Sequence, residues 1–127
     1  MTENEAAREI VDSSLKIHRA IGPGLLESVY VTVLAYELNQ RGLFVERERA
    51  VPLRYGDLLI EACFRADLIV ENKVIVEVKS VEHIMAVHAK QVLTYLRLAD
   101  MRLGLLINFN VPMIKDGITR VVNGLVE

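Results

Sequence analysis

Several residue types are scarce in this sequence, and each scarcity excludes a class of protein. The 127 residues contain no Trp and a single cysteine, Cys63, so no disulfide can form within the chain; a lone thiol suits a reducing compartment and is most simply a packing residue. No apolar run approaches the roughly 18 residues that a membrane-spanning helix needs. The N-terminus carries acids where a signal peptide needs a basic region. We therefore expect a soluble, cytoplasmic protein without a membrane segment.

A basic excess is also missing. The formal net charge is -2 at pH 7, whereas proteins that grip duplex phosphates over a broad face usually carry excess Lys and Arg. Strong non-specific DNA binding is therefore not expected, although a nuclease site must itself be acidic to hold a cation. Apolar residues make up 52% of the chain. At this length we expect one domain, residues 1–127, with a largely aliphatic core.

The pattern of apolar and turn residues predicts a mixed α/β (α+β) domain. A first helix should open at a Thr2–Glu5 capping box and stop at Gly22-Pro23-Gly24, with His18 in its core or at its boundary. A second helix should span 26–41. The later elements are expected as strands at 44–55, 59–70, 74–79 and 102–109, a third helix at 81–99 capped by Ser80, and an edge strand at 118–122. The order ααβββαβ(β) favours a mixed β-sheet flanked by helices.

The hairpin at 64–79 carries charged residues in an otherwise apolar setting. Side chains alternate along a strand, so Glu77 and Lys79 share one face. A three-residue turn would place Asp67 directly opposite Glu77, and Arg65 opposite Lys79. A register shorter by one residue would turn Asp67 to the other face.

Two carboxylates opposed across a sheet should repel, since their Cβ atoms lie about 4.5–5.5 Å apart. Their apolar neighbours suggest partial desolvation, so the charge needs compensation. A hard divalent cation held by carboxylate oxygens, a backbone carbonyl and water is the natural candidate, and Lys79 could then orient or deprotonate an attacking water. A simpler alternative stays open: Asp67 and Glu77 could pair with Arg65 and Lys79 on a solvated face.

The predicted helices add polar residues at regular spacing. His88, Gln91 and Tyr95 line one stripe of the third helix, beside an apolar stripe suited to packing on the sheet. The residues of that apolar stripe are Met85, Ala89, Val92, Leu96 and Ala99. In the second helix, Glu27 and Tyr30 lie one turn apart. Each has an ordinary interpretation too: surface and boundary residues in the third helix, and a favourable helix dipole contact for Glu27.

These residues carry a resemblance. Gly24-Leu25-Leu26-Glu27-Ser28-Val29-Tyr30 resembles the signature of the GxxExxY protein family, a branch of the PD-(D/E)XK nuclease superfamily. The similarity continues through Asp67, through Glu77-Val78-Lys79, and through segments 88–95 and 104–109. Gln91-x-x-x-Tyr95 also resembles the motif that follows the catalytic strand in RecB-type nucleases. The resemblance thus covers nearly the whole chain in the family's order.

The resemblance implies a PD-(D/E)XK nuclease fold and a site built on the hairpin. Asp67 and Glu77 would bind Mg2+ or Mn2+ with help from the Val78 carbonyl, and Lys79 would position the attacking water. Gln91 would orient that site or the substrate, and Glu27 would join it from the second helix on the evidence of the family alone. The residues expected to contact substrate are Tyr95, His88, Tyr30 and Arg65.

The leading hypothesis is therefore a metal-dependent nuclease, acting on DNA rather than RNA by the habit of the superfamily. A second hypothesis is a nucleic-acid- or protein-binding module that keeps the fold without turnover, and a third is a nuclease subunit of a larger repair or defence complex. We also expect a homodimer, because cutting both strands of a duplex usually needs two sites. Its contact could come from Val111, Met113 and Ile114.

Overall fold

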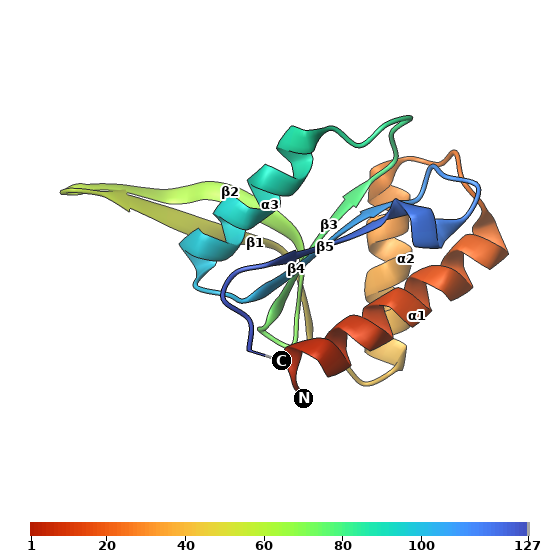
Figure 1. The fold of residues 1–127 in the computed structure, drawn as a ribbon. Helices are drawn as coiled ribbons and strands as arrows, with labels where there is room; N and C mark the ends of the chain where they lie inside the picture. Colours follow the sequence, from red (N-terminus) through yellow and green to blue (C-terminus); the bar gives the residue numbers. More distant parts are fainter. Residues whose placement is uncertain (127) are drawn as a thin grey trace.

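The computed structural model describes residues 1–126 as a five-stranded sheet with helices on both faces (Figure 1). Two helices, α1 and α2, cover one face, and α3 covers the other. The elements in chain order are α1 (Glu3–Ile21), α2 (Glu27–Gln40), β1 (Val45–Tyr55), β2 (Leu58–Val70), β3 (Val74–Lys79), α3 (Ala86–Ala99), β4 (Leu103–Asn108), the 3-10 turn η1 (Ile114–Gly117) and β5 (Ile118–Val122). The predicted fold class and element order are confirmed. No helix within this range is long and apolar enough to cross a membrane.

The strands lie in the sheet in the order β1-β2-β3-β4-β5. β3 and β4 are parallel, and the other neighbouring pairs are antiparallel. The connection through α3 brings the carboxyl ends of β3 and β4 to the same end of the sheet, where Lys79 pairs with Asn108. β3 is central and buried along almost its whole length, which agrees with the predicted apolar setting of the hairpin.

β3 divides its side chains between two hydrophobic cores, because successive residues of a strand point to opposite faces. Val76 and Val78 join the larger core beneath α1 and α2. Ile75 joins the smaller core beneath α3. Glu77 and Lys79 follow Ile75 in steps of two, so this alternation places both on the α3 side of the sheet.

α3 packs closely against β4. Its buried residues are Val92 and Leu96, and Gly104 of β4 lies directly beneath them. A Cβ at Gly104 would stand 2.6 Å from Val92 Cγ1, so a larger residue there would push the helix away from the sheet. The predicted apolar stripe is correct at these positions but wrong at Met85, which is 60% exposed and precedes the helix.

α3 also begins later than predicted, at Ala86 with Met85 as its N-cap, and Ser80 does not cap it. The Ser80 hydroxyl instead donates to the carbonyl of Leu25 at 2.6 Å. The backbone of Val81 is bonded to a side chain of β4. Because these groups are used in tertiary contacts, the segment that joins β3 to α3 is irregular rather than helical.

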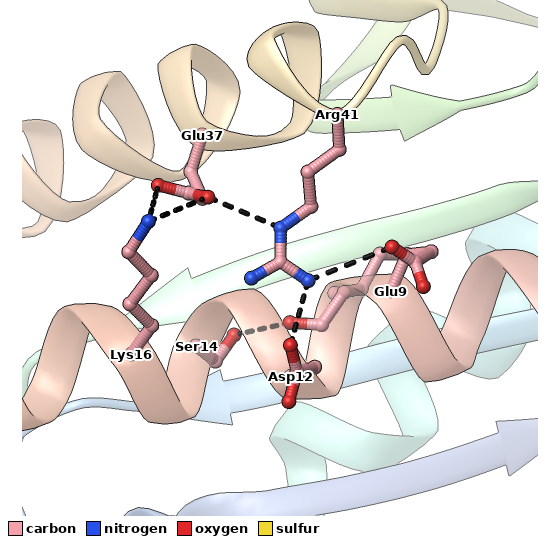
Figure 2. A network of polar contacts seen from close by, with 7 residues as sticks. Glu9, Asp12, Ser14, Lys16, Glu37 and Arg41 are labelled. Carbon is pink, nitrogen blue, oxygen red and sulfur yellow. Dashed lines mark hydrogen bonds and ion pairs between the residues drawn. The ribbon is translucent and has the colours of Figure 1, made fainter.

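Arg41 links the C-terminal end of α2 to the middle of α1 (Figure 2). Its Nη1 lies 2.7 Å from Asp12 Oδ2 and 3.5 Å from Glu9 Oε1, and its Nε donates to Glu37 Oε2 at 3.1 Å. Lys16 of α1 contacts the same Glu37. Hydrogen bonds from Arg41 and Lys16 hold the pKa of Glu37 below its ordinary value. This network fixes α2, whose opposite end carries Glu27, against α1.

The loop between β4 and β5 packs on the end of α1. His18 is half-buried, as expected, and its Nε2 lies 2.8 Å from the carbonyl oxygen of Val111. Met113 is 55% exposed, but Ile114 is 3% exposed and belongs to the larger core. Ile114 therefore fills the core of its own chain and is not free for the dimer contact that the sequence suggested.

Candidate active site

The hairpin of β2 and β3 has the predicted register. Val70 pairs with Val74, and two further pairs follow before the ladder ends, one step short of Asp67 and Glu77. Beyond that point Asp67 turns its carboxylate to β3, where Oδ2 accepts a hydrogen bond from the Val78 backbone N–H at 2.9 Å. The strands thus part where the two acidic residues meet.

Arg65 is not paired with Lys79 as expected, because the ladder between β2 and β3 has already ended. Its guanidinium donates instead to the carbonyl oxygen of Glu48 on β1, at 3.4 Å. Within residues 1–126, neither Asp67 nor Glu77 forms an ion pair with a Lys or Arg side chain. The alternative of a solvated salt-bridge ladder is therefore not what the structure shows.

Glu77 is the most unusual charged residue of the site. Its side chain lies beneath α3 and the residue is 8% exposed. Burial, followed by the charge of Asp67, raises the pKa of Glu77 to about 8, and the charge of Lys79 opposes this rise. Its Oε1 is buried without a hydrogen-bond partner in the part of the chain that the structure describes. A buried, unpartnered carboxyl oxygen is costly to a fold.

The donor groups around Glu77 fit a hard divalent cation that needs only one or two carboxylate ligands. Among residues 1–126 there is no cluster of three or more His, Cys, Asp or Glu side chains, so Asp67 and Glu77 would be the only acidic ligands. Mg2+ commonly binds through one or two carboxylates and keeps several waters, unlike Ca2+ with its six to eight oxygens. Val78 could offer only its backbone carbonyl, because its side chain lies in the larger core.

Lys79 ends β3 at the same end of the sheet. Its side chain is half-buried, and its ammonium group forms no hydrogen bond or ion pair with residues 1–126. Its charge nevertheless reaches Glu77, whose pKa it lowers. An ammonium group that no protein acceptor holds is free to contact a water molecule or a phosphate.

Glu27 lies beside the residue that follows Lys79, apart from the acidic pair. Its Oε2 accepts from the Ser80 backbone N–H at 3.3 Å, at the first position of α2. A hollow of about 480 Å³ opens next to it, lined by Gly24, Leu25, Leu26, Glu27, Ser28, Ser80 and Asn110. The structure thus brings Glu27 to the edge of the site through the backbone of Ser80, the residue that follows β3.

Tyr30 corrects an expectation. The side chain is fully buried and stacks on Phe109, with ring centroids 4.4 Å apart. Its hydroxyl donates to the carbonyl of Gly22 at 2.6 Å and accepts from the N–H of Leu25 at 3.2 Å. Tyr30 therefore shapes the turn that delivers Glu27 and is not exposed to a substrate.

Tyr95 of α3 faces the acidic pair. Its ring stacks on Phe64 of β2, with centroids 3.7 Å apart. Partial burial raises the pKa of Tyr95, and the charges of Glu77, Cys63 and Asp67 raise it further. Cys63 is exposed, so its thiol is a surface group close to the site rather than the packing residue that the sequence suggested.

Gln91 and His88 occupy the preceding turns of α3. Gln91 is exposed, one turn before Tyr95, and its amide has no hydrogen-bond partner among the described residues. His88 is half-buried, and its Nδ1 accepts from the Met85 backbone N–H at 2.9 Å. One ring nitrogen of His88 is therefore engaged in capping α3.

Two residues have roles in this geometry that the sequence did not predict: Ser80, which was expected to cap the third helix, and Asn108, which was not singled out. Ser80 ties β3 to the turn before α2, and Asn108 bonds the backbone of Val81. Asn108 carried one available signal, as the only polar side chain in the apolar run 103–109. A polar residue in a buried strand usually has specific partners.

Comparison with known proteins agrees with this geometry. A family model described as the PD-(D/E)XK nuclease superfamily matches residues 4–121. The matched range includes α1 from its second residue, all of α2 and α3, and β1 to β4 with the acidic hairpin. No curated protein and no solved structure matches the chain.

Proposed function

Because the chain belongs to the PD-(D/E)XK nuclease superfamily, we propose that it is a divalent-cation-dependent nuclease that hydrolyses phosphodiester bonds. The observation that carries the proposal is the buried carboxyl of Glu77, which has a second carboxylate, Asp67, beside it and one oxygen without a hydrogen-bond partner in the described part of the chain. No cation of the described chain pairs with either group. Mg2+ or Mn2+ would supply the missing compensation.

The residues of the hairpin would divide the chemistry between them. When bound, the cation would stabilise negative charge on the scissile phosphate. Asp67 and Glu77 would hold it, aided by the Val78 carbonyl. Lys79 would orient the water whose oxygen attacks phosphorus while the phosphorus bond to the leaving oxygen breaks. The Lys79 ammonium has no acceptor among residues 1–126, which supports this role.

The residues of α3 and α2 would complete the site. Tyr95 and Gln91 would orient the water or the substrate, since Tyr95 faces the carboxylates and the exposed Gln91 amide has no partner within residues 1–126. Glu27 would act through the Ser80 backbone N–H. His88, in the first turn of α3, and Arg65, in β2, stay as proposed substrate contacts.

The finer assignment follows the motifs. We infer the GxxExxY branch from Glu27 and Tyr30, with their spacing from Gly24, and from the hairpin that follows. DNA is proposed over RNA because DNA is the usual substrate in the superfamily.

The net charge of the chain is -2, so a second protein subunit would help it to bind a polyanion. This supports either a homodimer or a nuclease subunit in a larger complex. A binding module without turnover is the alternative. Sedimentation of a monomer at micromolar concentration, with and without DNA, would contradict the homodimer.

Calorimetric titration with Mn2+ and Mg2+ tests the site without knowledge of the substrate. We expect the wild type to bind the cation and Asp67→Asn to lose most of this affinity, since one of two anionic ligands is gone. Asp57→Asn, at the exposed tip of the β1–β2 hairpin, is the matched control and should bind as the wild type does. Equal heats for all three proteins would remove the metal site, and would favour the binding module.

A further inference from the structure

The chain that leaves β3 is held by one side chain of β4. Asn108 ends β4, is 2% exposed, and pairs with Lys79 in the parallel ladder. Its Oδ1 accepts from the Val81 N–H at 3.1 Å, and its Nδ2 donates to the Val81 carbonyl at 2.9 Å. The amide therefore reproduces both bonds of a strand pair, two residues beyond Lys79, where the main-chain ladder has ended.

Asn108 is itself fixed in place. Its Oδ1 also accepts from the Asn110 N–H at 3.2 Å, and two donors at this oxygen determine which end of the amide points which way. The next residue, Phe109, donates its N–H to the Lys79 carbonyl at 3.0 Å. On the other side, Gly117 approaches so closely that a Cβ there would overlap the Asn108 carbonyl oxygen. The Asn108 amide and the backbone on either side of it are therefore held by contacts from several directions.

The residue between Lys79 and Val81 is held from the opposite direction. The Ser80 N–H donates to Glu27, and its hydroxyl donates to Leu25. The segment 79–81 is thus tied to α2 through Ser80 and to β4 through Asn108. Because the Lys79 ammonium has no hydrogen-bond partner among the described residues, this backbone path is what determines where the ammonium can reach.

We propose that Asn108 is a positioning residue for Lys79: by pairing with Val81 it fixes the backbone from which the lysine side chain extends toward the acidic pair. The proposal rests on the proposed nuclease function. It predicts an effect on turnover and not on cation binding, because Asn108 contacts neither Asp67 nor Glu77. Misplacing a reacting group by a small distance is enough to cost a large part of the rate.

Turnover is measured for wild type, Asn108→Ala and the control Asn123→Ala. Asn123 is the matched choice because its Nδ2 donates to a backbone carbonyl, that of Met101, at 3.0 Å, beyond the far end of β4. We expect Asn108→Ala to lower kcat by about 10- to 100-fold, the scale for groups that orient a primary residue. KM and Mn2+ affinity should stay within about twofold, and Asn123→Ala should cleave as the wild type does.

A double-mutant cycle separates positioning from a general loss of stability. If Asn108 acts through Lys79, Asn108→Ala should cost nothing further in a Lys79→Ala background. Asn108→Asp covers the case in which the alanine variant does not fold: it keeps Oδ1 but places a second acceptor against the Val81 carbonyl, and should lower kcat similarly. A folded Asn108 variant with wild-type kcat, or a full additional loss in the Lys79→Ala background, would overturn the proposal.

Amide hydrogen exchange gives a readout that needs no substrate. Loss of the Asn108 amide should speed exchange of the Val81 N–H by at least about tenfold, with little change at the core amides of β3. Unchanged exchange at Val81 would overturn the proposal whether or not the protein cleaves. A wild type that binds no cation and cleaves nothing would instead refute the nuclease function.

Discussion

The Asp67 carboxylate accepts a hydrogen bond from the backbone N–H of Val78 at 2.9 Å, directly beyond Glu77. This bond holds the two carboxylates together although the charge of Asp67 raises the pKa of Glu77. It also gives Asp67 two separable roles. Its oxygen satisfies a buried N–H, whereas its negative charge is available for a cation.

We predict opposite stability effects for two substitutions of Asp67 in the metal-free protein. Asp67→Asn keeps an acceptor for the Val78 N–H and removes the repulsion with Glu77, so it should stabilise the fold by a few tenths to about 1 kcal/mol. Asp67→Ala leaves that N–H unpaired and should destabilise by about 1–3 kcal/mol. Thermal melts in chelator, near pH 9 where Glu77 is also ionised, measure both. Destabilisation by both variants would mean that the charge itself is structural.

The hairpin that carries this bond could be predicted from the sequence. The register of the hairpin was predictable because a short turn and an apolar alternation leave few ways to pair the strands, and the pairing of Val70 with Val74 confirms it. Alternation also placed Glu77 and Lys79 on one face. These inferences depend on neighbours within about fifteen residues of each other in the chain.

Contacts between distant segments were not predictable in this way. Tyr30 was assigned to substrate because its spacing from Glu27 matched a motif, yet its partners are the turn before α2 and Phe109. Ser80 has the composition of a helix cap, but its hydroxyl meets Leu25, 55 residues earlier in the chain. Local patterns carry no information about such partners, so the tertiary contact overrides the local preference.

Glu77 makes the stability of the metal-free protein depend on pH. Its pKa is raised from 4.5 to about 8, first by burial and then by Asp67, so between these values the folded protein keeps a proton that the unfolded chain has lost. Stability should therefore fall as pH rises from about 4.5 to about 8, by at most ~1.4 kcal/mol per pH unit. Urea unfolding in chelator across this range should show the slope in wild type and lose most of it in Glu77→Gln. An equal slope of unfolding free energy against pH in both proteins would mean that groups other than Glu77 cause it.

Arg41 should contribute more to stability than an ordinary surface cation. Its guanidinium contacts Glu9, Asp12 and Glu37 and is only 19% exposed. We expect Arg41→Ala to lower the free energy of unfolding by about 1–2 kcal/mol, above the ~0.2–1 kcal/mol typical of one exposed pair. Arg102→Ala removes a single pair with Asp100, which is 85% exposed, and should stay within about 0.5 kcal/mol of wild type. Equal losses of unfolding free energy for Arg41→Ala and Arg102→Ala in denaturant would show that the network stabilises the fold no more than a single exposed pair.

Cleavage of labelled nucleic acid by wild type, Lys79→Ala and Lys115→Ala, with and without Mn2+ or Mg2+, tests the nuclease proposal most directly. Lys115 lies on the exposed part of η1 and serves as the matched lysine control. We predict that wild type and Lys115→Ala cleave only with the cation. Lys79→Ala should bind Mn2+ normally, but its cleavage rate should fall by about 100-fold or more. Cleavage by Lys79→Ala at the wild-type rate, or no cleavage of single-stranded DNA, duplex DNA or RNA by the wild type with either cation, would contradict the proposal.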